Sequence, residues 1–246
     1  MISGLYSAAT AMDAAAMRHE TSAANLANAH MPGFRRRVVS QTPFDVTMAD
    51  AQDKSSMSTL LGTTIGTTEN AIKVDFSQGG LKQTGNKYDI ALNGDGFFVV
   101  EGPDGPLYTR NGQFQANNDG ELLTVDQLPV LGVNGPIVIP PDTVMNAVNV
   151  DNEGRFTANG VEFGQLETVR FPNRNVLTPV GASLFQKPDN VTPEVSNVEV
   201  LQGHVEQGNA AYMVELVNIM VASRQYEAAQ RVLNSIDESV EKHINT

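Results

Sequence analysis

From Ile2 to Leu26, mostly small or apolar residues recur at alternating spacings of three and four. This is the heptad pattern of a helix that packs against a partner along one narrow stripe. The members of this stripe are Ile2, Leu5, Ala9, Met12, Ala16, His19, Ala23 and Leu26. Most of them are small or only modestly apolar, so a partner helix can come close. Because such helices gain most of their stability from tertiary packing, the pattern predicts an N-terminal helix that requires a partner.

The predicted helix ends within the stretch "ANLANAHMPGFRRR", which runs from Ala24 to Arg37. Pro32 lacks the N–H group that a helix needs, and it pushes the residue before it away from helical angles. Pro32 and Gly33 fit the two central positions of a type II turn, with Gly33 at positive φ. The sequence therefore predicts a chain-turn junction at Pro32, Gly33 and Phe34.

Three features of this junction are interpreted from sequence alone. Asn25 and Asn28 share one face of the helix and either face solvent or hydrogen-bond to backbone groups. The basic run Arg35–Arg37 is either a solvated junction or a docking contact for an acidic surface of another copy. For Gly33→Val the sequence predicts a backbone strain of roughly 1–2 kcal/mol, with the isolated chain close to wild-type stability.

A second helical pattern occupies residues 203–246. Its main stripe alternates spacings of four and three through Tyr212, Leu216, Ile219, Ser223, Tyr226, Gln230, Leu233, Asp237, Val240 and Ile244. A further apolar strip runs through Val214, Val217, Val221, Ala228 and Val232. A helix with two apolar strips contacts more than one neighbour, so both ends of the chain are predicted to be interaction helices. The alternative is a simple intramolecular helix pair, which needs only one strip on each helix.

Between the two ends, the apolar period changes from that of a helix to that of a strand. Short strands are predicted at Tyr88–Leu92, Gly96–Glu101, Gly120–Val125 and Pro136–Pro140, separated by Asn-Gly and Asp-Gly dipeptides that suit tight hairpins. The chain thus divides into a helix at 1–34, an extended arm at 35–75, an antiparallel β domain at 76–187, a return linker at 188–202 and a helix at 203–246. The predicted fold class is α+β, with long N- and C-terminal helices that pair as a coiled coil and with the β domain and extended arm inserted between them.

Composition excludes several classes of function. The net charge of −12 argues against nucleic acid as a partner, because phosphate binding needs a basic face. The absence of cysteine excludes disulfides, thiolate nucleophiles and cysteine-ligated metals. No stretch approaches the roughly 18 apolar residues of a membrane span, so no membrane insertion is expected. A cleaved signal peptide is not expected either, because the first basic residue is Arg18 and Asp13 interrupts the apolar run.

Motifs for catalysis or cofactor binding are weak throughout the chain. Gly94 and Gly96 form a Gly-x-Gly that a hairpin explains better than a dinucleotide site, because aromatic strand residues follow it. The segments Asp151–Gly154 and Asn117–Gly120 faintly resemble calcium loops but lack the full ligand spacing, so they are interpreted as turns. The histidines show no paired ligand spacing; they are His19, His30, His204 and His243. We therefore predict no enzymatic activity, no cofactor and no metal.

Three separate stretches of the chain are similar to motifs of one family. "NLANAHMPGF" (Asn25 to Phe34) resembles its N-terminal signature, with Ala24 and Met31 in place of asparagine and threonine. "QGGLKQTGNKYDIALNGDGFF" and "YTRNGQF" are similar to its β-domain motifs, and "QGHVEQGNAAYMVELVNIMVASRQYEA" to its C-terminal helix motif. On these residues the chain resembles the bacterial flagellar axial proteins, and within them the basal-body rod proteins of the FlgG and FlgF type. Features of both the distal and the proximal rod types are present, and the choice between them stays open.

The resemblance implies a structural subunit of the rod that self-assembles through its terminal helices into a helical tube and transmits torque. Its implied partners are further copies, neighbouring rod and hook proteins and the flagellar export apparatus. Its implied location is the basal body, spanning the periplasm, reached by type III export without a cleaved signal peptide. Together with the two stripes, the resemblance predicts an assembly interface at Ile2, Leu5, Met12, Asn25, Leu26, Asn28, Leu216, Ile219, Tyr226 and Leu233.

Two other classes of protein are alternatives to the rod subunit. One is an adhesin-like or phage-tail-like envelope fibre, and the other is an enzyme that acts on the cell wall. A glycan-cleaving enzyme would need a pair of carboxylates facing each other across a cleft, and the sequence offers no such pair. The placement of the two helical segments at opposite ends of the chain favours the rod over a linear fibre.

Overall fold

The structure, a computed structural model, describes residues 2–42, 68–141 and 148–244. The chain divides into two compact units. The helical unit comprises Met1–Ala27, Arg37–Val74 and Ala211–Thr246, and the β unit comprises Asn28–Arg36 and Asp75–Ala210. The backbone therefore passes from one unit to the other at four places.

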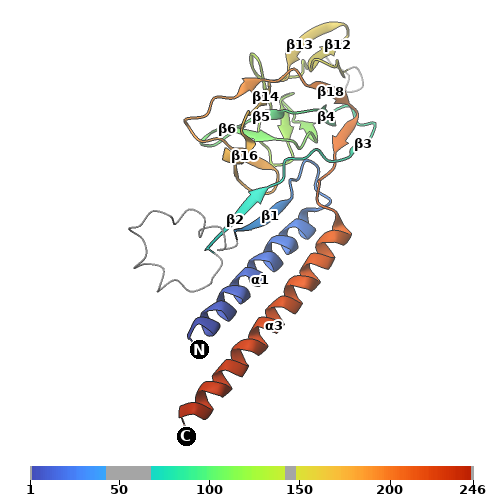
Figure 1. The fold of residues 1–246 in the computed structure, drawn as a ribbon. Coiled ribbons are helices and arrows are strands. Elements are labelled where there is room, and N and C mark those ends of the chain that lie inside the picture. The colour runs from blue at the N-terminus through green and yellow to red at the C-terminus, as the bar shows by residue number, and fades with distance from the viewer. Residues whose placement is uncertain (1, 43–67, 142–147, 245–246) are drawn as a thin grey trace. The chain divides into compact units, whose positions relative to one another are not determined.

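The helical unit contains both long helices and one two-stranded ribbon. Helix α1 spans Ile2–Asn28 and helix α3 spans Tyr212–Ile244, and the two run in opposite directions (Figure 1). A side-chain hydrogen bond of 3.0 Å joins Arg18 Nη1 on α1 to Gln225 Oε1 on α3. Strands β1 (Arg37–Thr42) and β2 (Thr68–Val74) pair antiparallel, with Arg37 opposite Val74. These strands form the two ends of the predicted arm, whose residues 43–67 lie outside the described residues.

The predicted fold class, with terminal helices paired as a coiled coil, is wrong. The chain has a helix at each end and otherwise mostly antiparallel β-structure, and its described residues show no coiled coil. The predicted α1 stripe is not the buried one: among its described side chains α1 buries Ala8, Ala14, Ala15, Thr21, Ser22 and Asn25, and none of these is a stripe position. Alanine, serine, threonine and asparagine do not supply the large apolar knobs that a coiled-coil seam inserts into its partner.

On helix α3 the buried positions are displaced from the predicted stripe by one residue. Among its described side chains the buried ones are Glu215 and Ala222, each one position before the predicted Leu216 and Ser223. Leu216, Ile219 and Leu233 are half-buried, whereas Tyr226 is exposed. The helix thus buries the carboxylate of Glu215 and the methyl group of Ala222, seven residues apart. These side chains do not form the leucine seam of a coiled coil.

The β unit is built from short strands joined by tight turns. In chain order they are β3 (Leu81–Gln83), β4 (Ile90–Asn93), β5 (Phe97–Gly102), β6 (Gly105–Thr109), β7 (Phe114–Ala116), β8 (Leu122–Thr124), β9 (Leu131–Gly132), β10 (Gly135–Pro136), β11 (Val148–Val150), β12 (Arg155–Ala158), β13 (Val161–Gln165), β14 (Thr168–Arg170), β15 (Thr178–Pro179), β16 (Leu184–Gln186), β17 (Glu194–Val195), β18 (Glu199–Gln202) and β19 (His204–Glu206). One 3-10 turn, η3 (Arg174–Val176), precedes β15.

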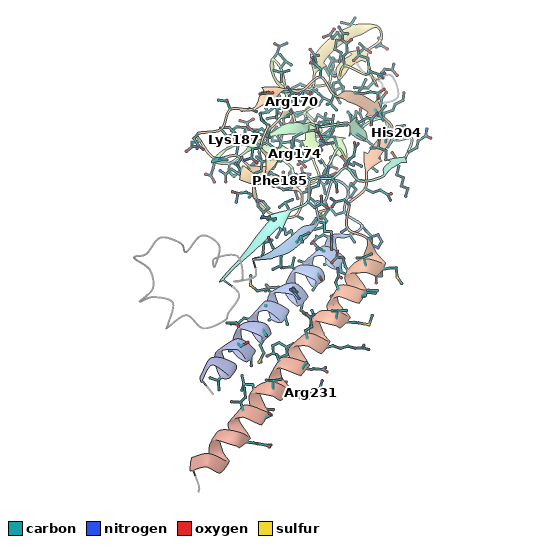
Figure 2. All side chains as sticks on the ribbon, viewed as in Figure 1. Arg170, Arg174, Phe185, Lys187, His204 and Arg231 are labelled. Atoms are coloured by element: carbon teal, nitrogen blue, oxygen red, sulfur yellow. The ribbon has the colours of Figure 1, made fainter. Side chains whose placement is uncertain are left out.

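The largest described sheet has six strands in the order β15-β16-β6-β5-β14-β17, all paired antiparallel. Four of them, β16, β6, β5 and β14, are labelled in Figure 1. Strand β5 lies inside this sheet, and its residues from Phe97 to Val100 are all buried. Phe98 and Val100 belong to the main hydrophobic core, which also draws on β4, β8, β11 and β12. Phe97 instead contacts an aromatic cluster that includes Phe76, Phe171 and Phe185, the last of these labelled in Figure 2. A buried strand with apolar side chains on both faces therefore links two cores.

The β-structure continues beyond the predicted boundary at residue 187. Strand β18 pairs with β4, and β19 pairs with β3, in the segment expected to be a return linker and the start of the last helix. Val200 and Val205 from these strands are buried. Helix α3 accordingly begins at Tyr212 and not at residue 203. Strands of three or four residues carry too little periodicity to be recognised, and their partners lie more than a hundred residues away in the chain.

Candidate functional site at the chain junction

The turn after α1 has the local geometry that its sequence requires. The helix ends at Asn28, and the Met31 N–H donates to the Asn28 carbonyl at 2.9 Å. Phe34 N–H then donates to the Met31 carbonyl at 3.3 Å, which closes a turn with Pro32 and Gly33 at its centre. Gly33 has φ of 69°. The predicted positive φ at this glycine is confirmed.

The turn is held against the rest of the β unit by close backbone contact. The Gly33 N–H donates to the Glu206 carbonyl at 2.7 Å. A Cβ atom at Gly33 would overlap the backbone nitrogen of Asn111 and lie 2.7 Å from its Cα. Phe34 is fully buried and packs with Ala29 and Ala210. The glycine is therefore required twice, for its backbone angle and for the space it leaves.

A buried ion cluster lies directly behind this turn. Arg35 Nη2 donates to Glu206 Oε1 at 2.7 Å, and Arg110 Nη1 donates to Glu206 Oε2 at 3.2 Å. The three side chains are at most 3% exposed. Glu206 Oε1 also accepts the Gly79 N–H at 2.9 Å. One carboxylate thus joins two arginines and a glycine amide from three separate segments of the chain.

The cluster carries more cationic than anionic groups at its centre. Burial lowers the pKa of Arg110 to about 10, and the carboxylate of Glu206 partly offsets this while the charge of Arg35 adds to it. Arg110 is still protonated at neutral pH. Its Nη2 donates to the Gly94 carbonyl at 2.6 Å, and its guanidinium carbon lies 5.4 Å from the centre of the Phe97 ring. Removing the carboxylate would leave two buried cations without their common counter-ion, which is the costly way to break a buried ion pair.

Asn209 connects three further backbone groups beside the cluster. Its Oδ1 accepts the Arg36 N–H at 2.7 Å, and its Nδ2 donates to the carbonyls of Asp75 and Ser77 at 2.8 and 3.1 Å. The Asp75 N–H in turn donates to the Arg36 carbonyl at 2.8 Å. The segments that leave the β unit after Arg36, before Asp75 and after Ala210 are therefore hydrogen-bonded to one another. We call Arg35, Arg110, Glu206 and Asn209 the junction network.

Asn25 fulfils one of the two interpretations left open for it. The Asn25 side chain is almost fully buried. Its amide nitrogen and its amide oxygen both hydrogen-bond to the backbone of Arg37. Its Nδ2 donates to the Arg37 carbonyl at 2.7 Å, and its Oδ1 accepts the Arg37 N–H at 2.8 Å. The amide pairs with Arg37 as a neighbouring strand would, so it places the start of β1.

The first residue of the basic run, Arg35, is buried in the β unit. Because Arg35 is buried against Glu206, it cannot take part in a docking contact with another copy. Arg36 and Arg37 contribute backbone groups that Asn209 and Asn25 bind. At Arg35, therefore, the run is neither solvated nor a docking contact, and instead forms an ion pair inside the β unit.

The two calcium-like segments are turns stabilised by their own groups. Asp151 Oδ1 accepts the N–H groups of Glu153 and Arg155 at 3.0 and 2.9 Å. Asn117 Oδ1 accepts the N–H groups of Asp119 and Glu121, each at 2.9 Å. Among the described residues, no cluster of three histidine, aspartate or glutamate side chains is arranged to hold a metal ion. The described helices include none that is both long and apolar enough to cross a membrane.

Comparison with known proteins decides the family. The model of the flagellar hook protein FlgE/F/G D1 domain matches residues 91–158, and that of the flagellar basal body rod FlgEFG protein C-terminal region matches residues 201–246. The flagellar basal-body rod protein FlgG of Buchnera aphidicola subsp. Schizaphis graminum is 33% identical, and the alignment covers 98% of each chain. The chain belongs to the flagellar basal-body rod proteins of the FlgG/FlgF type.

Other members of the family align over similar lengths. The FlgG protein of Agrobacterium fabrum is 31% identical over 94% of each chain. The FlgF protein of Caulobacter vibrioides is 28% identical over 87% of this chain and 85% of the relative. As a flagellar basal-body rod protein, the chain is a structural component of the basal body and not an enzyme. The predicted family and structural role are confirmed, and the fibre and wall-enzyme alternatives are not favoured.

The matched C-terminal region holds a surface that the junction does not use. On α3, Met213, Val214, Val217, Met220 and Val221 are between 47% and 70% exposed, and their spacings of three, four and seven place them on one helix face. We call these five residues the α3 apolar face. Val214, Val217 and Val221 belong to the second strip predicted from sequence, whereas the two methionines were not singled out.

The assembly residues predicted from sequence occupy varied environments in this rod protein. Leu5 and Tyr226 are exposed, and Asn25 is buried. The half-buried members are Met12, Leu26, Asn28, Leu216, Ile219 and Leu233. The side chain of Ile2 lies outside the described residues. Their role in assembly stays a prediction, as does the role of Pro32, Gly33 and Phe34 in directing the chain.

Sequence reasoning did not single out Arg110, Glu206 or Asn209. Each lies within a family motif quoted from the sequence, "YTRNGQF" for the arginine and "QGHVEQGN" for the other two. A charged residue inside a strand-rich motif full of glycine and aromatic side chains is a sign of a buried pair, since lone charges are costly to bury. That sign indicates burial but does not identify the partner.

Proposed function

We propose that this rod protein self-assembles with further copies, and with neighbouring rod and hook proteins, through the α3 apolar face, and that the resulting helical tube transmits torque. The proposal rests on that face, because a contiguous exposed apolar stripe on a protein marks an interaction site. Family membership supports the choice of partner, since basal-body rod proteins are the relatives that the chain matches over nearly its whole length.

The junction network has a defined part in this proposal. In a helical assembly every copy repeats the same geometry, so an error in the path of the chain between the two units recurs at each position. The network ties together the segments that leave the β unit. We infer that it directs these segments, and that Pro32, Gly33 and Phe34 form the turn on which this depends.

Delivery and location complete the proposal. The chain would reach the basal body through the flagellar export apparatus, without cleavage of its N-terminus, and would lie in the part of the rod that spans the periplasm. The family resemblance supports this route. Mass spectrometry of the chain from purified basal bodies, reading its N-terminal peptide, tests it.

A charge on the α3 apolar face is expected to prevent assembly. Val217→Asp places a carboxylate where a neighbouring subunit would bury it, and an unpaired buried charge costs several kcal/mol. Because 1.4 kcal/mol corresponds to about a tenfold change in an equilibrium constant, we expect incorporation into basal bodies to fall at least about tenfold, with loss of motility. The amount of the chain in purified basal bodies measures this directly.

The matched control makes the same chemical change in the β unit. Val161 lies on β13 next to the turn of the β12–β13 hairpin and is 68% exposed, so Val161→Asp should leave incorporation unchanged. Circular dichroism should show both variants folded. Normal incorporation of Val217→Asp would contradict the proposal, and an equal loss for Val161→Asp would show that the effect is not specific to α3.

A further inference from the structure

We propose that Met213 and Met220 are oxidation sites, and that their conversion to methionine sulfoxide in the unassembled subunit blocks its assembly through the α3 apolar face. This inference rests on the proposed function of that face. It adds a chemical modification and a means of regulation, because methionine sulfoxide is reduced back to methionine by dedicated reductases.

The two methionines differ from the other described ones in exposure. Met213 is 70% exposed and Met220 is 55% exposed. Met12, Met17 and Met31 are half-buried, and Met31 packs against the small apolar cluster around Phe34. Since an oxidant must reach the sulfur atom, exposure favours reaction at the two sites on α3.

Met213 and Met220 lie on the face proposed for assembly, so their oxidation would affect assembly. They are seven residues apart and therefore lie on one helix face, with Val217 between them at a spacing of four from Met213. Three exposed valines complete the face, and none of its five side chains carries a hydrogen-bonding group that could receive a sulfoxide. A neighbouring subunit that buries this face would also bury the new S=O groups.

The reaction needs a two-electron oxidant of the peroxide class. The lone pair of the methionine sulfur attacks one oxygen of hydrogen peroxide, an S–O bond forms and the O–O bond breaks. The sulfur is oxidised by two electrons, and the second peroxide oxygen leaves as water after a proton shift. The product is a polar, chiral sulfoxide in place of a flexible apolar thioether. Burial of a sulfoxide without a hydrogen-bond donor opposes association.

The first measurement finds the sites of oxidation. The purified, unassembled full chain is treated with limiting hydrogen peroxide, and each methionine-containing peptide is followed by mass spectrometry. We expect Met213 and Met220 to be oxidised several times faster than Met12, Met17 and Met31. Equal rates across these five residues would overturn the site assignment.

The second measurement finds the effect on assembly. Cells make either the wild-type chain or the double variant Met213→Leu/Met220→Leu under sublethal peroxide, and the chain in basal bodies and in the unassembled pool is quantified. Leucine keeps the face apolar and similar in volume but cannot be oxidised. We expect peroxide to lower incorporation of the wild type at least about tenfold and to leave that of the double variant unchanged. Sulfoxides at both sites should be correspondingly depleted from basal bodies.

The outcomes of these experiments distinguish the inference about methionine oxidation from the proposal that the α3 apolar face mediates assembly. If Val217→Asp blocks incorporation but wild-type chain carrying both sulfoxides incorporates normally, only the inference about oxidation is overturned. If Val217→Asp incorporates normally, the proposed assembly face is overturned as well. An equal loss of wild type and double variant under peroxide would show that other sites are responsible, which also contradicts the inference.

Discussion

Replacing Glu206 by alanine is expected to lower the free energy of unfolding of the β unit by about 3–5 kcal/mol, the usual cost of leaving a buried charge without its partner. The carboxylate is fully buried and accepts hydrogen bonds from Arg35, Arg110 and the Gly79 amide. Without it, two buried guanidinium groups lose their common counter-ion. Urea denaturation followed by circular dichroism measures the loss.

The control for this prediction is an exposed glutamate that also pairs with an arginine. Glu194 pairs with Arg170 at 2.8 Å, and both side chains are about half exposed. Exposed ion pairs contribute about 0–1 kcal/mol, so Glu194→Ala should be nearly neutral. If Glu206→Ala does not fold at all, Glu206→Gln keeps the shape and one acceptor and should fold with a smaller loss. Equal stability of the Glu206→Ala and Glu194→Ala variants would show that the junction network does not stabilise the fold.

Gly33→Ala is expected to destabilise the chain by more than backbone strain alone. The positive φ of 69° costs a residue with a Cβ about 1–2 kcal/mol. The Cβ would also overlap the Asn111 backbone, and overpacking of this kind typically adds about 1–3 kcal/mol. This corrects the expectation from sequence that a side chain at Gly33 would leave the isolated chain close to wild-type stability.

A second glycine separates the two contributions. Gly160 has a similar φ of 81° but has open space around the position of a Cβ, so Gly160→Ala should lose only the strain. The difference between the two variants in their free energy of unfolding, measured by urea denaturation, gives the cost of the overlap with Asn111. The same loss in both would mean that the turn can shift away from Asn111 at no cost, and that its position is not fixed by close packing.

The parts of the fold that local chemistry determines could be predicted from the sequence. Pro32 and Gly33 place the end of α1 and a turn with positive φ, because each acts through its own backbone. The strands around Phe98 and Leu122 follow from short apolar runs that glycine-containing turns bound on either side, and the side chains of both strands are buried on both faces. None of these features depends on a distant part of the chain.

The parts that depend on distant contacts could not be predicted in this way. Glu206 pairs with residues 171 and 96 positions away, and the chemistry of a glutamate does not identify either one. The buried face of α1 differs from the predicted stripe because the pattern favours large side chains such as Met12 and Leu26, whereas α1 buries alanines, Thr21, Ser22 and the Asn25 amide. Small residues are buried where close approach matters more than apolar area, and periodicity does not distinguish these cases.

The central claim is that a neighbouring subunit covers the α3 apolar face in the rod. The chain contains no cysteine, so Val217→Cys introduces a single thiol at the middle of that face. Its rate of reaction with a maleimide is measured in the unassembled chain and in basal bodies purified from motile cells. The account predicts rapid labelling of the unassembled chain and labelling at least about tenfold slower in basal bodies. Equal rates in the two states would contradict it.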